Sequence, residues 1–284
     1  MSTTPAIDSC TVETSDGVKL HTKIFKPNPY QEGGEITKNG SWVVVLVHPY
    51  SILGGCQSLL KGIASGVSRK GYKALTFDMR GVGRSSGKPS ITGFKEVEDV
   101  VAVCKWACQN LAVNKILLVG SSAGMRCERL AVKRLRKGRG KPKKYGSKVI
   151  RHDMTQLQLT EDMTHAGRVW RTRIGVEGAP IAGSAVDQVE QIVGYVSIGY
   201  PFGLLASVLF GRHHKNILKS PKPKLFIMGT QDGFTTVKQL NNKLRSAAGR
   251  VETHLIEGIG HFELEGPAYD SQMVIFIAEF LSTL

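Results

Sequence analysis

Three polar side chains, far apart in the chain, each follow an apolar stretch and could together carry out nucleophilic catalysis. Ser122 lies within residues 120–124, Gly-Ser-Ser-Ala-Gly, which is a G-x-S-x-G sequence. Asp232 follows a later apolar run, and His261 follows the last one, in Gly-Ile-Gly-His. A serine hydroxyl attacks a carbonyl carbon when a base takes its proton, and a carboxylate orients that base. The chain order Ser122, Asp232, His261 therefore suits acyl transfer through a Ser-His-Asp triad.

The G-x-S-x-G pattern is weak evidence by itself, because the chain contains a second copy at residues 83–87. That copy, which contains Ser85, leads into Lys-Pro-Ser and is typical of a loop. Residues 120–124 instead follow a strand-like run and consist of small residues, as a strained strand-to-helix turn requires. We therefore predict that Ser122 is the nucleophile and interpret Ser85 as a loop residue.

The other two members of the triad each have a simpler interpretation. Asp232 precedes a glycine, and Asp-Gly is also a common turn sequence. His261 is one of eight histidines and could be an ordinary loop residue. Among the others, His213 and His214 lie in Arg-His-His-Lys, which favours a solvated surface turn. Asp232 and His261 each follow an apolar run, and this position favours them as the acid and the base.

The elements that must position these residues can be read from the apolar runs. Each run of strand length ends before a polar or glycine-rich segment, and helical spacing separates several of them. The expected strands are 42–47, 73–77, 115–119, 193–198, 225–228 and 251–256, the expected helices are 59–69, 94–111, 237–247 and 273–281, and a hairpin is expected around residues 16–17. This alternation predicts an α/β fold with a mostly parallel sheet covered by helices on both faces. In such sheets the chemistry collects at the carboxyl ends of the strands.

With these motifs in place, the sequence resembles the α/β-hydrolase superfamily, especially small lidless serine hydrolases of the serine-aminopeptidase-like and dienelactone-hydrolase-like kind. The resemblance covers about residues 10–124 and 179–284. The sequence Asp-x-Arg-Gly-x-Gly-x-Ser at residues 78–85 strengthens the resemblance. The resemblance implies that the glycines of this motif and Arg80 order the loops around them. Lids in that family enter after the strand expected at 193–198, where this chain has too few residues for a large cap domain.

The resemblance also implies two backbone donors for the oxyanion of an acyl-transfer reaction. One is the N–H of Ala123, which follows the nucleophile. The other follows a His-Gly pair in the family, and here that pair is His48-Pro49, so Tyr50 would supply the N–H. Proline has no N–H, but none is needed at its position. His48 itself is interpreted as a structural loop residue.

A basic segment departs from the family pattern at the point where the elbow should lead into a helix. Residues 125–178 hold fifteen of the 38 Lys and Arg residues but only five of the 23 Asp and Glu residues. Removing this segment joins residues 120–124 to the small residues that begin at Ala179. We interpret 125–178 as a poorly ordered insertion, such as the translation of a retained intron. Alternatively, residues 125–137 extend the elbow helix, or residues 126–151 bind nucleic acid or an anionic membrane.

The remaining composition narrows the class of protein. No apolar run is long enough to span a membrane, and the N-terminus lacks the pattern of a secretory signal. Five cysteines at no metal-like spacing favour a reducing, cytoplasmic location and predict no metal site. We therefore expect one α/β-hydrolase domain over residues 1–284 that needs no cofactor. It would hydrolyse a small acyl ester, a thioester or an amide; a catalytically impaired or purely binding protein is the alternative. Nothing in the sequence indicates the oligomeric state.

Overall fold

The computed structural model of the chain describes residues 5–27, 41–51, 55–90, 92–122, 175–176 and 178–284. Most of the segment interpreted as an insertion therefore lies outside the described residues, so the expectation that it is poorly ordered stays a prediction. The helix considered for residues 125–137 and the nucleic-acid-binding candidate 126–151 lie outside them as well. Gly178 is an exception at its edge, because it begins a helix that packs on the sheet.

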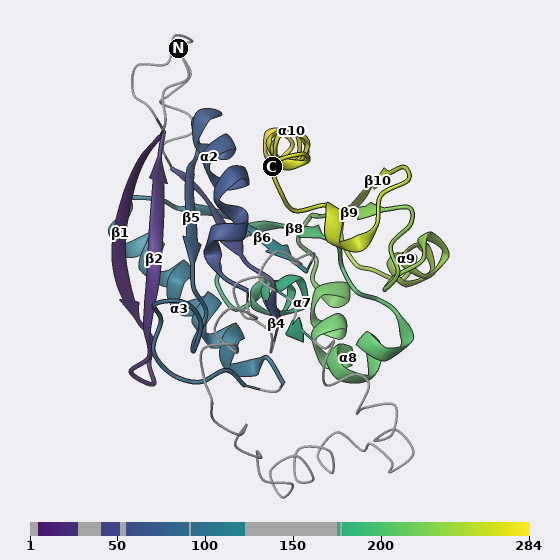
Figure 1. The fold of residues 1–284 in the computed structure, drawn as a ribbon, viewed down its shortest axis with the longest axis horizontal. Helices are drawn as coiled ribbons and strands as arrows, with labels where there is room; N and C mark the ends of the chain where they lie inside the picture. The colour runs from purple at the N-terminus through teal and green to yellow at the C-terminus, as the bar shows by residue number, and fades with distance from the viewer. Residues whose placement is uncertain (1–4, 28–40, 52–54, 91, 123–174, 177) are drawn as a thin grey trace, which may run out of the picture.

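An eight-stranded sheet forms the centre of the molecule (Figure 1). Its strands are β1 (Ala6–Glu13), β2 (Lys19–Lys26), β3 (Trp42–Val47), β5 (Lys73–Phe77), β6 (Lys115–Ser121), β8 (Ile192–Ile198), β9 (Lys224–Gly229) and β10 (Val251–Ile256). Their spatial order is β1-β2-β5-β3-β6-β8-β9-β10. The strands from β5 to β10 in this order run parallel, and β2 pairs antiparallel with both of its neighbours, β1 and β5. The expected mostly parallel α/β sheet is confirmed.

Helices cover both faces of this sheet, and each face has its own apolar core. The helices are α2 (Lys61–Arg69), α3 (Phe94–Asn110), α7 (Gly178–Ala185), α8 (Leu204–Lys219), α9 (Val237–Leu244) and α10 (Asp270–Ser282). Side chains of α2 and α10 belong to one core, and those of α3, α7, α8 and α9 to the other. Strand β3 is buried along its whole length because both of its faces are covered, which explains its unbroken apolar sequence.

One sequence-based interpretation was wrong. His213 and His214 do not lie in a solvated turn: they are on α8, with only 1% and 4% of their surfaces exposed. Burial lowers the pKa of His214 to about 3, so its ring is neutral near pH 7. The two basic residues that flank the pair suggested a surface turn, but the histidines face inward.

The loop after β5 is ordered by charge, as the resemblance implied for Arg80. The Arg80 guanidinium is buried and donates to both oxygens of Asp99 on α3 and to Asp16 in the β1–β2 turn. Ser85 has a structural task, because its hydroxyl donates to the carbonyl oxygen of Asp78 and accepts the N–H of His21. Both interpretations of this loop are confirmed, and the second G-x-S-x-G copy is a loop.

Candidate active site

The loops after β9 and β10 bring the expected acid and base together at the carboxyl edge of the sheet. Nδ1 of His261 lies 2.6 Å from Oδ2 of Asp232, and both side chains are buried. The other carboxylate oxygen, Oδ1, accepts the N–H groups of Phe234 and Thr235 at 2.7 and 2.9 Å. These two bonds fix the carboxylate plane, so that one oxygen is left to orient the imidazole.

The imidazole is held by the chain on both sides of it. His261 begins a short 3-10 helix, η2 (His261–Glu263), and the carboxylate of Glu263 accepts the N–H of Gly260 at 2.6 Å. The rings of Phe234 and Phe262 lie 4.5 and 5.2 Å from the ring of His261. The imidazole therefore has little freedom to rotate, as a general base requires.

Ser122 follows directly after β6 and contacts the imidazole, but through its backbone. Its N–H donates to the carbonyl oxygen of Ile198 on β8, so it continues the pairing of the sheet. Nε2 of His261 lies 3.0 Å from the carbonyl oxygen of Ser122. The buried hydroxyl of Ser122 has no hydrogen-bond partner among the residues that the structure describes. The serine and the histidine are therefore adjacent, whereas the hydroxyl–imidazole bond of a working triad is not formed.

This contact affects the availability of the base. A neutral imidazole has one N–H, so it can donate to Asp232 or to the carbonyl oxygen of Ser122, but not to both. While Nε2–H donates to that carbonyl, the same nitrogen cannot take a proton from the hydroxyl. The arrangement therefore needs a local shift around Ser122 before His261 can act as its base.

The helix at the end of β6 comes from the far side of the basic segment. Helix α7 begins at Gly178 and packs on β6, between α3 and α8 (Figure 1). A Cβ atom at Gly178 would lie 2.4 Å from the carbonyl oxygen of His48 and 2.6 Å from that of Ser121. A Cβ atom at Gly120 would lie 2.7 Å from Cα of Ala179. Only glycine at these two positions permits so close an approach of α7 to the ends of β3 and β6.

The loop after β3 carries one of the two expected oxyanion donors, and Ala123, the other, lies outside the described residues. Nδ1–H of His48 donates to the carbonyl oxygen of Pro49 at 2.7 Å, and Nε2 accepts the N–H of Met79 at 3.1 Å. His48 is fully buried, and burial lowers the pKa of its ring. It thus links two loops, which agrees with the structural interpretation of this residue.

Tyr50 has a neighbour that the sequence did not predict. Tyr50 and Ser51 form strand β4 (Tyr50–Ser51), which pairs antiparallel with β7 (Gly175–Val176), and Tyr50 lies opposite Val176. The end of the basic segment is therefore placed beside the loop that would bind the oxyanion.

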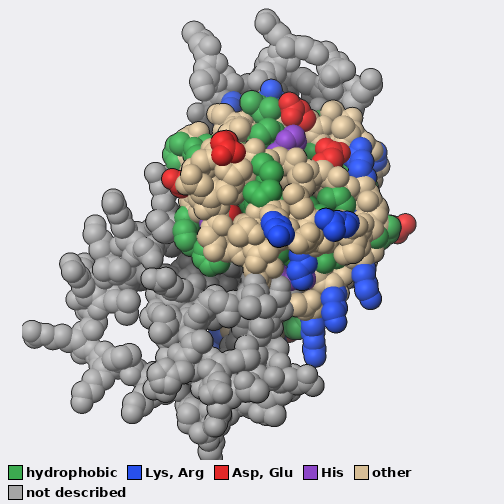
Figure 2. All heavy atoms as spheres, turned by 90° about the vertical axis from the view of Figure 1, so that its right-hand side faces the viewer, with side chains coloured by type: hydrophobic (Ala, Val, Ile, Leu, Met, Phe, Trp, Pro, Cys, Tyr) green, Lys and Arg blue, Asp and Glu red, His purple; other side chains and the backbone are tan. Residues whose placement is uncertain are grey.

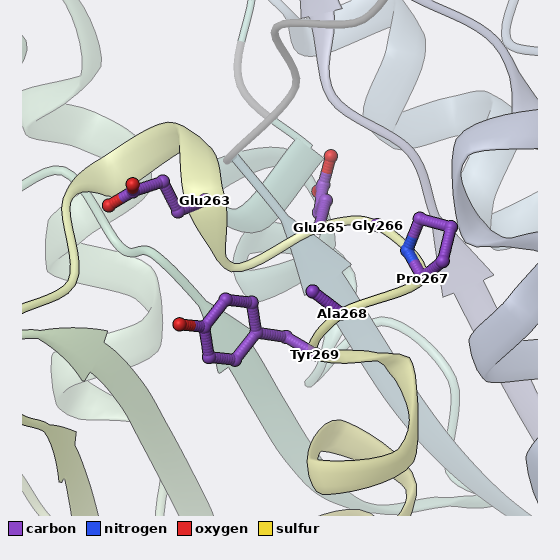
Figure 3. Close-up of a pocket in the computed structure, with 6 residues that line it drawn as sticks. All are labelled: Glu263, Glu265, Gly266, Pro267, Ala268 and Tyr269. Carbon is purple, nitrogen blue, oxygen red and sulfur yellow. The ribbon is translucent and has the colours of Figure 1, made fainter.

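A cavity of about 470 Å³ lies next to His261 in the chain (Figure 3). It is lined by Glu263, at the end of η2, and by residues 265–269, which lead to α10 and include Glu265 and Tyr269. Figure 3 shows polar ends of these side chains projecting from the loop. Two carboxylates, those of Glu263 and Glu265, contribute to its lining.

A metal site and a membrane span are the other features to consider in the described part of the chain, and its surface charge can be seen on one face. No group of three His, Cys, Asp or Glu side chains there is arranged to bind a metal ion. None of the described helices has the length and hydropathy of a transmembrane span. Figure 2 shows several Lys and Arg side chains toward the lower right of the face that it presents, separated from one another by uncharged surface, and most of the Asp and Glu side chains in its upper part.

Comparisons with known proteins agree with this fold. A family model for X-Pro dipeptidyl-peptidases (S15 family) matches residues 16–133, which is less than half of the chain. No curated protein sequence matches significantly. Among solved structures, an α/β serine hydrolase homologue from Coxiella burnetii superposes with a TM-score of 0.62 at 18% identity, covering 96% of this chain and 97% of the other.

Two further structures extend the likeness. An esterase from Pyrococcus furiosus gives a TM-score of 0.62 at 16% identity, covering 98% of this chain and 91% of its own. A serine hydrolase without a lid from Xanthomonas campestris gives 0.57 at 16% identity, covering 92% and 88%. The chain therefore has the fold of these α/β hydrolases. The solved structures that it resembles include serine hydrolases and esterases.

Sequence reasoning selected Asp232 and His261, which the structure brings together, but it missed two features of this site. It did not find the pairing of Tyr50 with Val176, because two-residue strands carry no periodic signal. It also missed that Nε2 of His261 faces the carbonyl of Ser122 rather than its hydroxyl. The small residues that follow Gly178 were a signal for α7, and its close packing on β6 bears this out.

Proposed function

We propose that this chain is a serine hydrolase that cleaves small acyl esters with Ser122 as nucleophile, His261 as base and Asp232 as the orienting acid. The observation that carries the proposal is the buried contact between Asp232 and His261, 2.6 Å long, beside Ser122 at the end of β6. The similarity to serine hydrolases and esterases supports the same reaction class. Thioesters and amides are the other acyl substrates that such a site would accept.

The proposed reaction has two halves. Oγ of Ser122 attacks the carbonyl carbon while Nε2 of His261 takes the hydroxyl proton, and the N–H groups of Tyr50 and Ala123 hold the oxyanion. The tetrahedral intermediate collapses, and His261 gives its proton to the leaving alcohol. Water then attacks the acyl-enzyme with the same base, which releases the acid and restores the serine. This route needs no cofactor, and each proton passes through His261, whose Nδ1 faces Asp232 throughout.

A second candidate, an impaired hydrolase, is favoured by two observations around the basic segment. Nε2 of His261 faces the carbonyl oxygen of Ser122, where it cannot accept the hydroxyl proton. Tyr50, a proposed oxyanion donor, lies opposite Val176 in β7. A displacement of about 1 Å in a catalytic group can reduce a rate about a hundredfold. We infer that residues 125–178 interrupt one hydrolase domain and weaken the activity of the full chain.

Labelling with a fluorophosphonate probe, which reacts with activated serines, tests both candidates. We expect the shortened chain without residues 125–178 to be labelled at least tenfold faster than the full chain. Ser122→Ala should abolish labelling in both forms. Ser85→Ala, the matched change in the second G-x-S-x-G copy, should leave Ser122 as the residue that the probe labels. Labelling that survives Ser122→Ala would overturn the assignment of the nucleophile. Equal rates for the two forms would overturn the inference about the segment.

Nucleic-acid binding through residues 126–151 is the rival use of the basic segment, and no described contact favours it. Such binding would fall steeply with salt and disappear when residues 125–178 are removed, which a titration with labelled DNA would measure. A cytoplasmic location is proposed with the hydrolase function, because Cys10, Cys104 and Cys108 are free thiols, as a reducing compartment allows. Cell fractionation tests that location.

A further inference from the structure

A chain of hydrogen bonds joins α7 to two neighbouring segments on the side that faces α8. The hydroxyl of Ser184, on α7, lies 2.6 Å from Nδ1 of His213, on α8. Nε2 of His213 lies 2.7 Å from the carbonyl oxygen of Thr92, which precedes α3. Figure 1 shows α7 between α3 and α8, so one histidine connects all three elements.

The protonation of His213 follows from its surroundings. The side chains of Ser184 and His213 are buried, and burial lowers the pKa of the imidazole, which is therefore neutral near pH 7. Since the Thr92 carbonyl can only accept, Nε2 carries the proton, and Nδ1 accepts the hydroxyl hydrogen of Ser184. The ring also stacks on Phe94 with 4.6 Å between centroids. Both nitrogens and a ring face are thus used in holding segments together.

Helix α7 needs such contacts because the chain does not hold it at the end of β6. Residues 123–177 separate Ser122 from Gly178, whereas the chain without residues 125–178 would have only a two-residue link at this point. A connection of many residues constrains its two ends less than a two-residue link does. Contacts between α7 and its neighbours therefore contribute more to holding this helix in place.

We propose that His213 is a positioning residue: through Ser184, near the C-terminal end of α7, and through Thr92 it holds the whole helix in place, including Gly178 at the end of β6 and with it the backbone around Ser122. Gly178 transmits the position, since it lies against the carbonyl of Ser121. The consequence for catalysis rests on the proposed function, but the holding of α7 does not.

Hydrogen exchange of the full chain, followed by mass spectrometry, tests the holding of α7 without any activity. His213→Phe keeps an aromatic ring but removes both hydrogen bonds. We expect it to speed the exchange of α7 amides by about tenfold relative to those of β9, because the loss of a buried hydrogen bond has about this effect. Ser184→Ala should act similarly, and the double variant should add little, since both remove the same interaction.

The matched control is His214→Phe, the neighbouring buried histidine on α8. His214 packs against the rings of Tyr200 and Phe202 instead. Its substitution should change the exchange of α7 and β9 to similar extents. If His213→Phe also affects α7 and β9 equally, or leaves α7 unchanged, His213 does not position this helix and the proposal is overturned.

Fluorophosphonate labelling of the same full-length variants tests whether the position of α7 affects the reactivity of Ser122. His213→Phe should slow labelling at least tenfold and His214→Phe less than threefold. If α7 loosens in His213→Phe while labelling of Ser122 keeps its rate, His213 holds the helix but does not position the nucleophile, which overturns that half of the proposal. If the unmodified full and shortened chains are not labelled at all, the proposed function fails, and hydrogen exchange alone decides the structural half.

Discussion

Replacing Asp232 with asparagine tests the proposed catalytic site most directly, because the structure determines how the new amide must lie. Oδ1 of Asp232 accepts two backbone N–H groups, from Phe234 and Thr235. An asparagine that turned its NH₂ group toward them would leave two buried donors unsatisfied, at about 1–3 kcal/mol each. The amide oxygen therefore keeps these two bonds, and the NH₂ group faces His261.

This orientation reverses the tautomer of His261. Its Nδ1 now faces a donor, so it must accept a hydrogen bond, and the ring proton moves to Nε2. A protonated Nε2 cannot take the proton of the Ser122 hydroxyl. Substitutions with this effect on a triad reduce kcat by about 10⁴-fold, which corresponds to about 5 kcal/mol of transition-state stabilisation. The fold should survive, because Asp232→Asn conserves the shape of the side chain.

The assay is hydrolysis of p-nitrophenyl acetate at pH 7.5, in whichever of the full and shortened chains is more active. Asp187→Asn is the matched control, since Asp187 accepts a hydrogen bond from Ser220 beyond the other end of α7. We expect a loss of about 10⁴-fold for Asp232→Asn and less than threefold for the control, with both proteins folded by circular dichroism. If Asp232→Asn keeps more than a tenth of the activity, Asp232 does not orient the base.

Three further predictions concern the scaffold. Arg80→Met leaves Asp99 buried without its cation, so the free energy of unfolding should fall by about 3–5 kcal/mol in urea denaturation, and an unchanged midpoint would contradict the pairing. The hydrogen bond from Arg80 lowers the pKa of Asp16 to about 2 from 3.8, so its contribution is complete above the unfolded-state pKa and is lost as pH falls toward 2. Asp16→Asn should therefore flatten the dependence of Tm on pH between 4 and 2, and an unaltered slope would exclude this source. Gly120→Ala should lower stability by about 1–3 kcal/mol and slow fluorophosphonate labelling, because its Cβ would meet Ala179, and normal labelling would show that α7 tolerates the displacement.

The architecture of this protein was predictable because it depends on local patterns. Strands that are covered on both faces must be apolar throughout, so β3 and β5 were predicted at their observed bounds. Parallel strands place their carboxyl ends at one edge, which brought Asp232 and His261 together in the prediction and in the structure. Helix α8 was not predicted, because its histidines lie among basic residues although they face the interior.

The amino-acid sequence by itself determined which strands form the central sheet, their mostly parallel arrangement and which polar residues reach one edge of that sheet, because these follow from hydrophobic periodicity and chain order. Only the tertiary structure decided how the edge is completed. Helix α7 returns to the end of β6 after a long interruption, His213 joins it to its neighbours, and His261 contacts the carbonyl rather than the hydroxyl of Ser122. Such contacts depend on the positions of segments far apart in the chain, and differences of about 1 Å decide which atoms meet. No local pattern of residues encodes distances of that size.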